Sequence, residues 1–271
     1  MRSLIEKKLK ELSTLAANSK QISNQEKPEC AICQDRGIFL KNNEALICSC
    51  MKQKGIYNKF KHANIGSQMQ HASFKKFNLS YYSDRVTLEE NTEISHRQTA
   101  KVTLEAAKQF TKDIVNNKTG KGLLLTGPVG SGKTFLAAAI ANYLIAHDKQ
   151  VLFVVVPDLL DEIRSTYQQQ SEEGITELLL TESAREAEIL ILDDLGMHNY
   201  TEWTTNKLYS IINYRANNNL PLIVTTNLDL LQLEKCLGNR TTSRLLQLCQ
   251  GYRLLVDVDI RYQLYEKHAN I

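Results

Sequence analysis

The chain has 271 residues, of which 42% are apolar and 23% charged, the composition of a soluble globular protein. This length suits one domain of about 170–190 residues together with a smaller one. No apolar run approaches the ~18 residues that a membrane-spanning helix needs, and no signal-peptide core follows the N-terminal lysines. We therefore expect a cytoplasmic protein with no membrane association.

Charge is distributed unevenly along the chain. Residues 1–83 contain 14 Lys and Arg against 6 Asp and Glu, a net charge of +8, whereas the remainder has a net charge of −5. A basic segment can bind nucleic acid, bind an acidic protein or simply stay in solution, and charge alone leaves all three open. Apolar residues at helical spacing predict an amphipathic helix over residues 3–18, which either packs on its own domain or docks on a partner.

Two pairs of cysteines in this basic third are spaced as metal ligands. They are a C-x-x-C pair and a C-x-C pair: Cys30 and Cys33, then Cys48 and Cys50. Apolar residues at 38–40 and 45–47 indicate a hairpin between the pairs. Four thiolates suit tetrahedral Zn²⁺ and leave no open position, so we predict a structural zinc site, with a redox pair or a chance spacing as the alternative. Cys236 and Cys249 stand alone on apolar stretches and are predicted core residues.

A glycine-rich stretch in the middle of the chain matches the pattern of a phosphate-binding loop. It comprises Gly127, Pro128, Val129, Gly130, Ser131, Gly132, Lys133 and Thr134. An apolar run precedes it and a helix-like segment follows, which is the context that the pattern requires. The glycines let successive backbone N–H groups point at phosphate oxygens, and the helix adds its positive end. Lys133 is predicted to reach the β- and γ-phosphates and Thr134 to ligate Mg²⁺.

Strands and helices are predicted to alternate over the rest of the chain. Strands are expected at residues 123–126, 151–156, 189–192 and 222–225. Helices are expected at residues 99–114, 135–147, 158–167, 177–186 and 203–216, the third capped by Asp158 and the last by Thr201. Residues 84–93 are expected to form a loop, and the aromatic residues between 74 and 82 to pack on the following domain. Continuous apolar strands separated by helices indicate an α/β fold whose parallel sheet is sandwiched by helices.

Polar residues follow two of these strands. Asp193 and Asp194 end the run 189–192, so they are expected to face the same crevice as the phosphate loop. Asp193 would hold Mg²⁺, and Asp194 would orient or deprotonate the attacking water. Asn227 follows the strand at 222–225 and could place its amide between the γ-phosphate and that water, a turn-forming role being the alternative.

Three arginines near the C-terminus complete the predicted site. Arg240 and Arg244 are four residues apart and share one face of a helix. We predict an arginine finger that enters the site of a neighbouring subunit, with a solvated surface as the alternative. Arg261 is a further candidate for contacting phosphates within its own subunit.

These pieces together resemble the AAA+ ATPases of the DnaC/DnaI type, bacterial replicative-helicase loaders, which are related to the IstB-like transposition helpers. The resemblance covers residues 74–268, and its motifs are at 74–79, 127–134, 156–164, 190–196, 201–203, 211–215, 225–228 and 240–245. It implies Walker A roles for Lys133 and Thr134, and Walker B roles for Asp193 and Asp194. It also implies sensor 1 at Asn227, the arginine finger at Arg244 with Arg240 beside it, and sensor 2 at Arg261. Asp194 replaces the usual Glu and is one methylene shorter, which implies slow hydrolysis.

The resemblance also implies that different parts of the chain have different functions. Residues 1–72 would form a small zinc-binding α+β domain that docks on the helicase, residues 73–98 a linker leading into the ATPase core, and residues 99–271 the AAA+ ATPase. ATP, Mg²⁺ and Zn²⁺ are the implied cofactors. The implied partners are a hexameric DnaB-type replicative helicase, single-stranded DNA, which the segment 159–167 would contact, and further copies of the chain.

The implied function is a partner-stimulated ATPase that places the helicase on single-stranded DNA when replication starts. Two alternatives stay open: an IstB-like transposition helper, and a nucleotide-gated adaptor with negligible turnover.

Overall fold

The computed structural model of the protein describes residues 38–41, 44–47, 69–89, 92–118, 120–165, 177–196 and 200–269. The chain divides into two compact units, residues 1–55 and residues 56–271. In the first unit, β1 (Ile38–Lys41) and β2 (Glu44–Ile47) pair antiparallel, with Ile38 opposite Ile47. This pairing confirms the predicted hairpin. The predicted helix at 3–18 and the four predicted zinc ligands, Cys30, Cys33, Cys48 and Cys50, lie outside the described residues.

The second unit contains the predicted alternation of strands and helices. It begins with η1 (Phe74–Lys76), η2 (Leu79–Tyr81), β3 (Val86–Glu89), β4 (Thr92–Ser95) and α3 (His96–Val115). It continues with β5 (Gly122–Thr126), α4 (Lys133–Ile145), β6 (Val151–Val155), α5 (Val156–Ser165), α6 (Glu177–Glu186) and β7 (Ile189–Leu195). It ends with α7 (Glu202–Asn217), β8 (Leu222–Thr226), α8 (Leu230–Leu248), β9 (Cys249–Arg253) and α9 (Ile260–Ala269).

Five parallel strands form the central sheet, in the order β6-β7-β8-β5-β9. The strand that leads into the phosphate loop, β5, lies between β8 and β9, and β8 separates it from β7. Because all five strands run the same way, the residues that follow β5, β7 and β8 meet at one edge of the sheet. A crevice at this edge is where open α/β sheets bind ligands.

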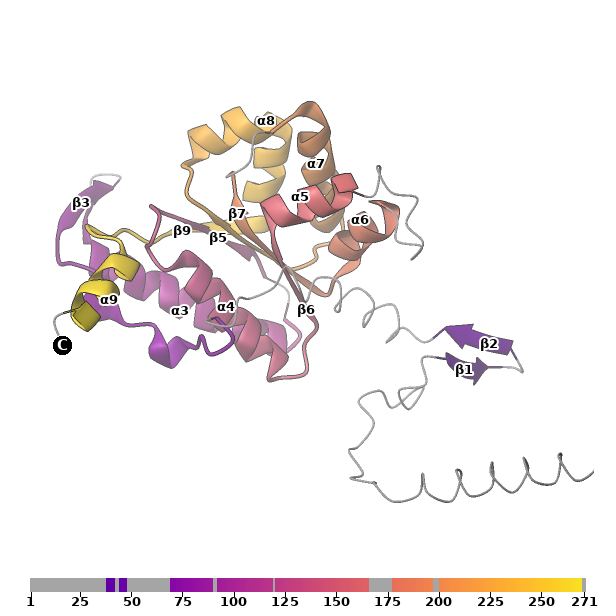
Figure 1. Cartoon of the computed structure of the whole chain (residues 1–271), viewed down its shortest axis with the longest axis horizontal. Coiled ribbons are helices and arrows are strands. Elements are labelled where there is room, and N and C mark those ends of the chain that lie inside the picture. The colour runs from indigo at the N-terminus through magenta and orange to yellow at the C-terminus, as the bar shows by residue number, and fades with distance from the viewer. Residues whose placement is uncertain are drawn as a thin grey trace, which may run out of the picture. The chain divides into compact units, whose positions relative to one another are not determined.

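Helices cover both faces of the sheet, so the central strands β5, β7 and β8 are buried on two sides (Figure 1). Leu124, Leu190 and Val224 pack with α5, α6, α7 and α8 in one core. Their sequence neighbours Leu125 and Ile191 point the other way and pack with α3 and α4 in a second core. This alternation explains why the strands read as continuous apolar runs and confirms the predicted sandwich.

Polar side chains cap the N-termini of α3, α7 and α8, which fixes where these helices begin. Ser95, Thr201 and Asp229 each accept a hydrogen bond from the third residue of α3, α7 and α8, respectively. Thr201 was predicted as a cap. Asp158 was also predicted, but α5 begins at Val156, so Asp158 lies in the first turn. The expected loop at 84–93 instead contains the antiparallel pair β3 and β4.

The buried side chain of Arg215 ties α7 to its neighbours. Its Nη1 donates to the carbonyl oxygens of Ala184, Arg185 and Ala187 at 3.1, 3.0 and 2.8 Å, and its Nη2 donates to that of Pro221 at 2.5 Å. Burial lowers the pKa of Arg215 to about 9. These four hydrogen bonds connect α7 to the C-terminal end of α6 and to the residue that precedes β8.

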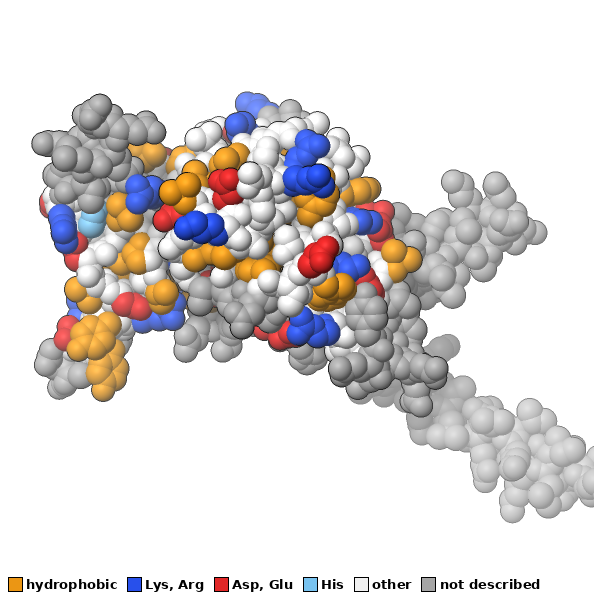
Figure 2. Space-filling model, turned by 90° about the horizontal axis from the view of Figure 1, so that it is seen from above, with side chains coloured by type: hydrophobic (Ala, Val, Ile, Leu, Met, Phe, Trp, Pro, Cys, Tyr) orange, Lys and Arg blue, Asp and Glu red, His pale blue; other side chains and the backbone are white. Residues whose placement is uncertain are grey.

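No helix among the described residues is both long and apolar enough to span a membrane. On the face shown in Figure 2, hydrophobic side chains are interspersed with basic and acidic ones. Large exposed apolar residues do occur on α9, where Tyr262 and Tyr265 are 57% and 71% exposed. Cys249 is buried and Cys236 packs against the α5–α8 core, as predicted.

Candidate nucleotide-binding site

The phosphate loop connects β5 to α4 through backbone conformations that favour glycine. Gly130 and Gly132 have φ angles of 72° and 89°, and Gly132 is the N-cap of α4. A Cβ atom on Gly130 would lie 1.9 Å from Cγ of Asp259, so a larger residue would collide with that carboxylate. The glycine pattern is thus required both by the turn and by the close approach of the segment before α9.

Lys133 is folded back into the loop. Its side-chain Nζ donates to the carbonyl oxygens of Gly127 and Pro128 at 2.8 and 2.7 Å, and the residue is 4% exposed. Burial lowers the pKa of Lys133 to about 8, and the charges of Asp194 and Asp193 oppose that change. The loop thus holds a poorly solvated ammonium group, which a phosphate oxygen would stabilise.

Thr134 and Asp193 bring the loop and β7 together. Thr134 Oγ1 donates to Asp193 Oδ1 at 3.1 Å, and Thr225 Oγ1 donates to the same oxygen at 2.5 Å. Asp193 is 2% exposed, and burial raises its pKa to about 6. A hydroxyl and a carboxylate at the end of a phosphate loop are oxygen ligands of the kind that Mg²⁺ prefers, so these residues fit the predicted ion.

Asp194 occupies a β-bulge. The pairing of β7 with β8 shifts between Leu192 and Leu195, whose partners are Val224 and Thr226. Asp194 has a φ of 56°, in the left-handed region, and it is partly exposed where Asp193 is buried. Bulges re-aim side chains. Two adjacent acids in the sequence are therefore placed in different environments at the same sheet edge.

The other predicted site residues come from the end of β8 and from α8 and α9. Asn227 directly follows β8 and is partly buried, at the same sheet edge as Asp193. Arg261 is exposed on α9, and its positive charge contributes to lowering the pKa of Lys133. Arg240 and Arg244 lie on α8 beyond Gly238, where a φ of 79° kinks the helix. Arg244 donates to Gln247 Oε1 at 2.7 Å, and within the described residues neither arginine hydrogen-bonds to the phosphate loop.

The segment before the sheet also contacts the loop, which the sequence did not reveal. The Tyr82 hydroxyl donates to the carbonyl oxygen of Ser131 at 2.7 Å, and Tyr82 is 1% exposed. Phe77 stacks on Tyr82 with ring centroids 5.6 Å apart. From the other end of the unit, the Ile260 N–H donates to the Gly130 carbonyl oxygen at 3.0 Å. The aromatic segment was predicted to pack on the following domain, and Phe77 and Tyr82 confirm this by lying in the α3–α4 core.

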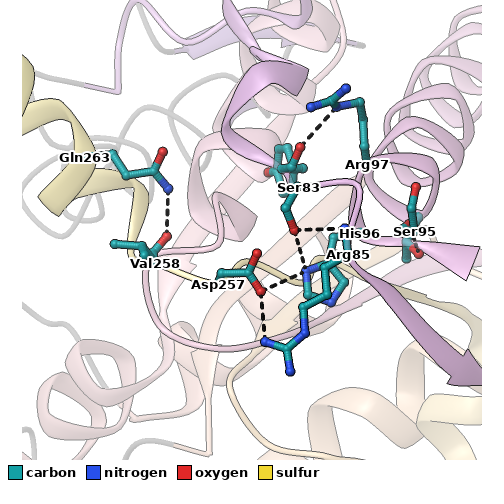
Figure 3. A network of polar contacts seen from close by, with 10 residues as sticks. Ser83, Arg85, Ser95, His96, Arg97, Asp257, Val258 and Gln263 are labelled. Carbon is teal, nitrogen blue, oxygen red and sulfur yellow. Dashed lines mark hydrogen bonds and ion pairs between the residues drawn. The ribbon is translucent and has the colours of Figure 1, made fainter.

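A polar network joins this segment to the chain that leads into α9 (Figure 3). Asp257 Oδ1 lies 3.3 Å from Arg85 Nη1 and 3.7 Å from His96 Nδ1. Ser83 Oγ lies 3.4 Å from the same His96 nitrogen. A hydrogen bond from Ser83, together with Arg85, holds the pKa of Asp257 below its usual range. The network thus links the segment that contains Tyr82 to the segment that precedes α9. Both segments contact the phosphate loop.

Comparison with known proteins identifies the family. A family model described as "IstB-like ATP binding protein" matches residues 70–250. The replicative helicase loader DnaC of Buchnera aphidicola (subsp. Schizaphis graminum) is 31% identical over 156 residues, which cover 58% of this chain and 61% of that protein. The replicative helicase loader DnaI of Bacillus subtilis is 32% identical over 119 residues, 44% of this chain and 37% of DnaI. The chain thus spans less than two thirds of the length of each of these relatives.

Solved structures agree with the fold. A crystal structure of the DnaC helicase loader is 21% identical, with a TM-score of 0.54, and covers 71% of this chain and 100% of that one. A crystal structure of DnaI is 26% identical, also with a TM-score of 0.54, and covers 69% and 92% of the two chains. The chain therefore belongs to the IstB-like ATP binding protein family and is an AAA+ protein of the DnaC/DnaI type.

Proposed function

We propose that this protein binds ATP and Mg²⁺ at the phosphate loop and uses them to load a hexameric DnaB-type replicative helicase onto single-stranded DNA. The observation that carries the proposal is the 3.1 Å contact between Thr134 and Asp193. This contact joins the phosphate loop to an acid on β7. The residues proposed to bind the phosphates and those proposed to hold Mg²⁺ thus lie next to each other in this chain. Such a loader would act in the cytoplasm.

Each predicted residue has a role in this proposal. Backbone N–H groups of the loop and the Lys133 ammonium bind the phosphates, and Thr134 and Asp193 hold Mg²⁺, which neutralises phosphate charge. Asp194 accepts a proton from, or orients, the attacking water, and Asn227 holds that water against the γ-phosphate. Arg261 contacts phosphate within the subunit.

Arg244, with Arg240 beside it, would complete the site of a neighbouring subunit. Arg240 is exposed and Arg244 is half-buried on α8. Within the described residues neither side chain hydrogen-bonds to its own phosphate loop, which leaves them available to a neighbouring subunit. Self-association of the chain would then depend on bound ATP, so nucleotide state would control assembly.

The helicase and DNA come to this proposal from the relatives, whose names describe replicative helicase loaders. We propose that residues 1–72 dock on the helicase while the ATPase unit contacts single-stranded DNA. In the N-terminal unit, we propose that Cys30, Cys33, Cys48 and Cys50 bind one structural Zn²⁺. The register of β1 and β2 supports this, because it places Ile38 and Ile47, which lead to the two cysteine pairs, opposite each other.

The deciding experiment is co-purification of the full-length protein with the replicative helicase of its own cell, in ATP and in ADP. We expect a complex that forms with ATP and transfers the helicase ring to a single-stranded DNA circle. Capture of a transposase instead, with no helicase, would favour the IstB-like helper. Helicase loading without any phosphate release would favour the nucleotide-gated adaptor.

A further inference from the structure

Thr225 on β8 contacts both acids of the candidate site through one hydroxyl group. Its Oγ1 donates to Asp193 Oδ1 at 2.5 Å and accepts the backbone N–H of Asp194 at 3.0 Å. A threonine hydroxyl has one proton and two lone pairs, so it can make both contacts at the same time. Thr225 is completely buried, so water does not compete for either bond.

The position of Thr225 in the sheet explains this double contact. Leu192 pairs with Val224 and Leu195 with Thr226, so Asp193 and Asp194 together face Thr225 across the bulge. A bulge takes one residue out of the regular ladder and leaves backbone groups without their usual partners. The Thr225 hydroxyl supplies a partner for the Asp194 N–H at the residue whose φ is 56°.

The same hydroxyl orients the Asp193 side chain. Asp193 Oδ1 accepts hydrogen bonds from Thr225 at 2.5 Å and from Thr134 at 3.1 Å, so the two hydroxyls together fix where this oxygen lies. Carboxylate oxygens of Asp193 would hold a divalent cation beside Thr134. A side chain of the same shape without the hydroxyl would fill the space and lose both effects.

We propose that Thr225 is a positioning residue that aims the Asp193 carboxyl group at Thr134 and keeps Asp194 in its bulge conformation. This inference rests on the proposed roles of Asp193 and Asp194 in ATP hydrolysis. It adds that the two acids are coupled, because one hydroxyl on the neighbouring strand holds both.

The test compares Thr225→Val, which keeps the shape, with Thr225→Ser, which keeps the hydroxyl. For full-length Thr225→Val we expect the Mg²⁺ concentration that gives half-maximal ATP hydrolysis to rise about tenfold, the loss expected for a hydrogen bond to a buried charge. Binding of an ATP analogue in EDTA should be unchanged, because the phosphate loop is intact.

Two controls separate this role from general packing. Thr225→Ser should restore the wild-type Mg²⁺ dependence. Thr111→Val, at a buried threonine whose hydroxyl donates to Lys108 within α3, should behave like wild type. If the valine variant does not fold, Thr225→Cys, with its weak donor, provides the same comparison.

The outcomes distinguish this inference from the proposed function. Wild-type Mg²⁺ dependence in Thr225→Val, while Asp193→Ala abolishes Mg²⁺-dependent hydrolysis, would overturn the role of Thr225 and leave the nucleotide site standing. If ATP binding and hydrolysis by the wild-type protein do not depend on Mg²⁺, the proposed function is wrong, and this inference is wrong with it.

Discussion

The Tyr82 hydroxyl donates a hydrogen bond of 2.7 Å to the carbonyl oxygen of Ser131, so a residue ahead of the sheet holds the phosphate loop. We expect Tyr82→Phe to fold but to bind ATP about fivefold more weakly, because a hydrogen bond of about 1 kcal/mol is lost and a buried carbonyl loses its donor. Titration with a fluorescent ATP analogue measures this change. Tyr81→Phe, in the same segment, should bind like wild type, and an equal loss in both variants would contradict a specific role for Tyr82.

Lys133→Ala should abolish ATP binding, because no other group of the loop carries a positive charge to the phosphates. Equilibrium dialysis or calorimetry checks the affinity. Lys101→Ala, which removes an exposed lysine of α3, is the matched control and should leave the affinity unchanged. Unchanged affinity in Lys133→Ala would rule out the phosphate-cradle assignment.

Arg244→Ala should bind ATP normally and lose DNA-stimulated hydrolysis by about 10³-fold, the effect typical of an arginine finger. Mixing experiments test whether the finger acts between subunits. Neither Lys133→Ala nor Arg244→Ala alone should hydrolyse ATP, whereas their mixture should recover activity, since one variant supplies the site and the other the finger. A mixture that stays inactive would show that Arg244 does not act in trans.

Asp193 predicts a pH dependence of stability in the metal-free protein. Its pKa of about 6 in the folded state lies above the value of about 3.9 for an unfolded chain, so the folded protein binds the proton more tightly. Stability should therefore fall as pH rises from about 4 to 6 and stay lower above that window. We expect Asp193→Asn to be about 2 kcal/mol more stable than wild type at pH 7.5, since it removes the buried charge. Urea unfolding in EDTA measures the difference, which should vanish at pH 4.

The control for this pH experiment is Asp161→Asn, at an exposed residue of α5. It should match wild type at both pH values. Equal stability of Asp193→Asn and wild type at pH 7.5 would mean that the Asp193 charge is not a destabilising group in the free protein.

Metal analysis of freshly reduced protein should find about one zinc per chain. Cys48→Ser should lose the metal and the ability to bind the helicase. Cys236→Ser, at a cysteine packed against the α5–α8 core, should keep both. Absence of zinc from the reduced wild-type protein would remove the proposed metal site.

Elements that carry a strong local signal were predictable from the sequence. The apolar run before Gly127 forms β5, and the helix expected at residues 135–147 forms as α4, two residues earlier at each end. Thr201 caps α7 as its sequence suggests. The strand β9 was missed because its sequence, CQGYR, has no apolar run, and it forms by pairing with β5. The hairpin of β3 and β4 was missed because its polar composition suggested a loop.

Within the site, the sequence identified residues but not the contacts that arrange them. Asp193 and Asp194 follow one another in the chain, yet a register shift against β8 separates their environments. Thr225 and Tyr82 gain their importance from contacts across 32 and 49 residues of sequence. Spacing rules within a motif cannot predict such distant partners.

The packing of Phe77 and Tyr82 decides how an isolated ATPase unit should be prepared. A shortened chain that starts at residue 99 would discard both side chains. It would uncover the apolar surface of α4 around Phe135, whose ring centroid lies 6.4 Å from that of Phe77. Such a fragment should aggregate and bind nucleotide poorly. A fragment that starts at Ile56, where the second compact unit begins, keeps the loop's supports and is the one suited to crystallisation with ATP analogues.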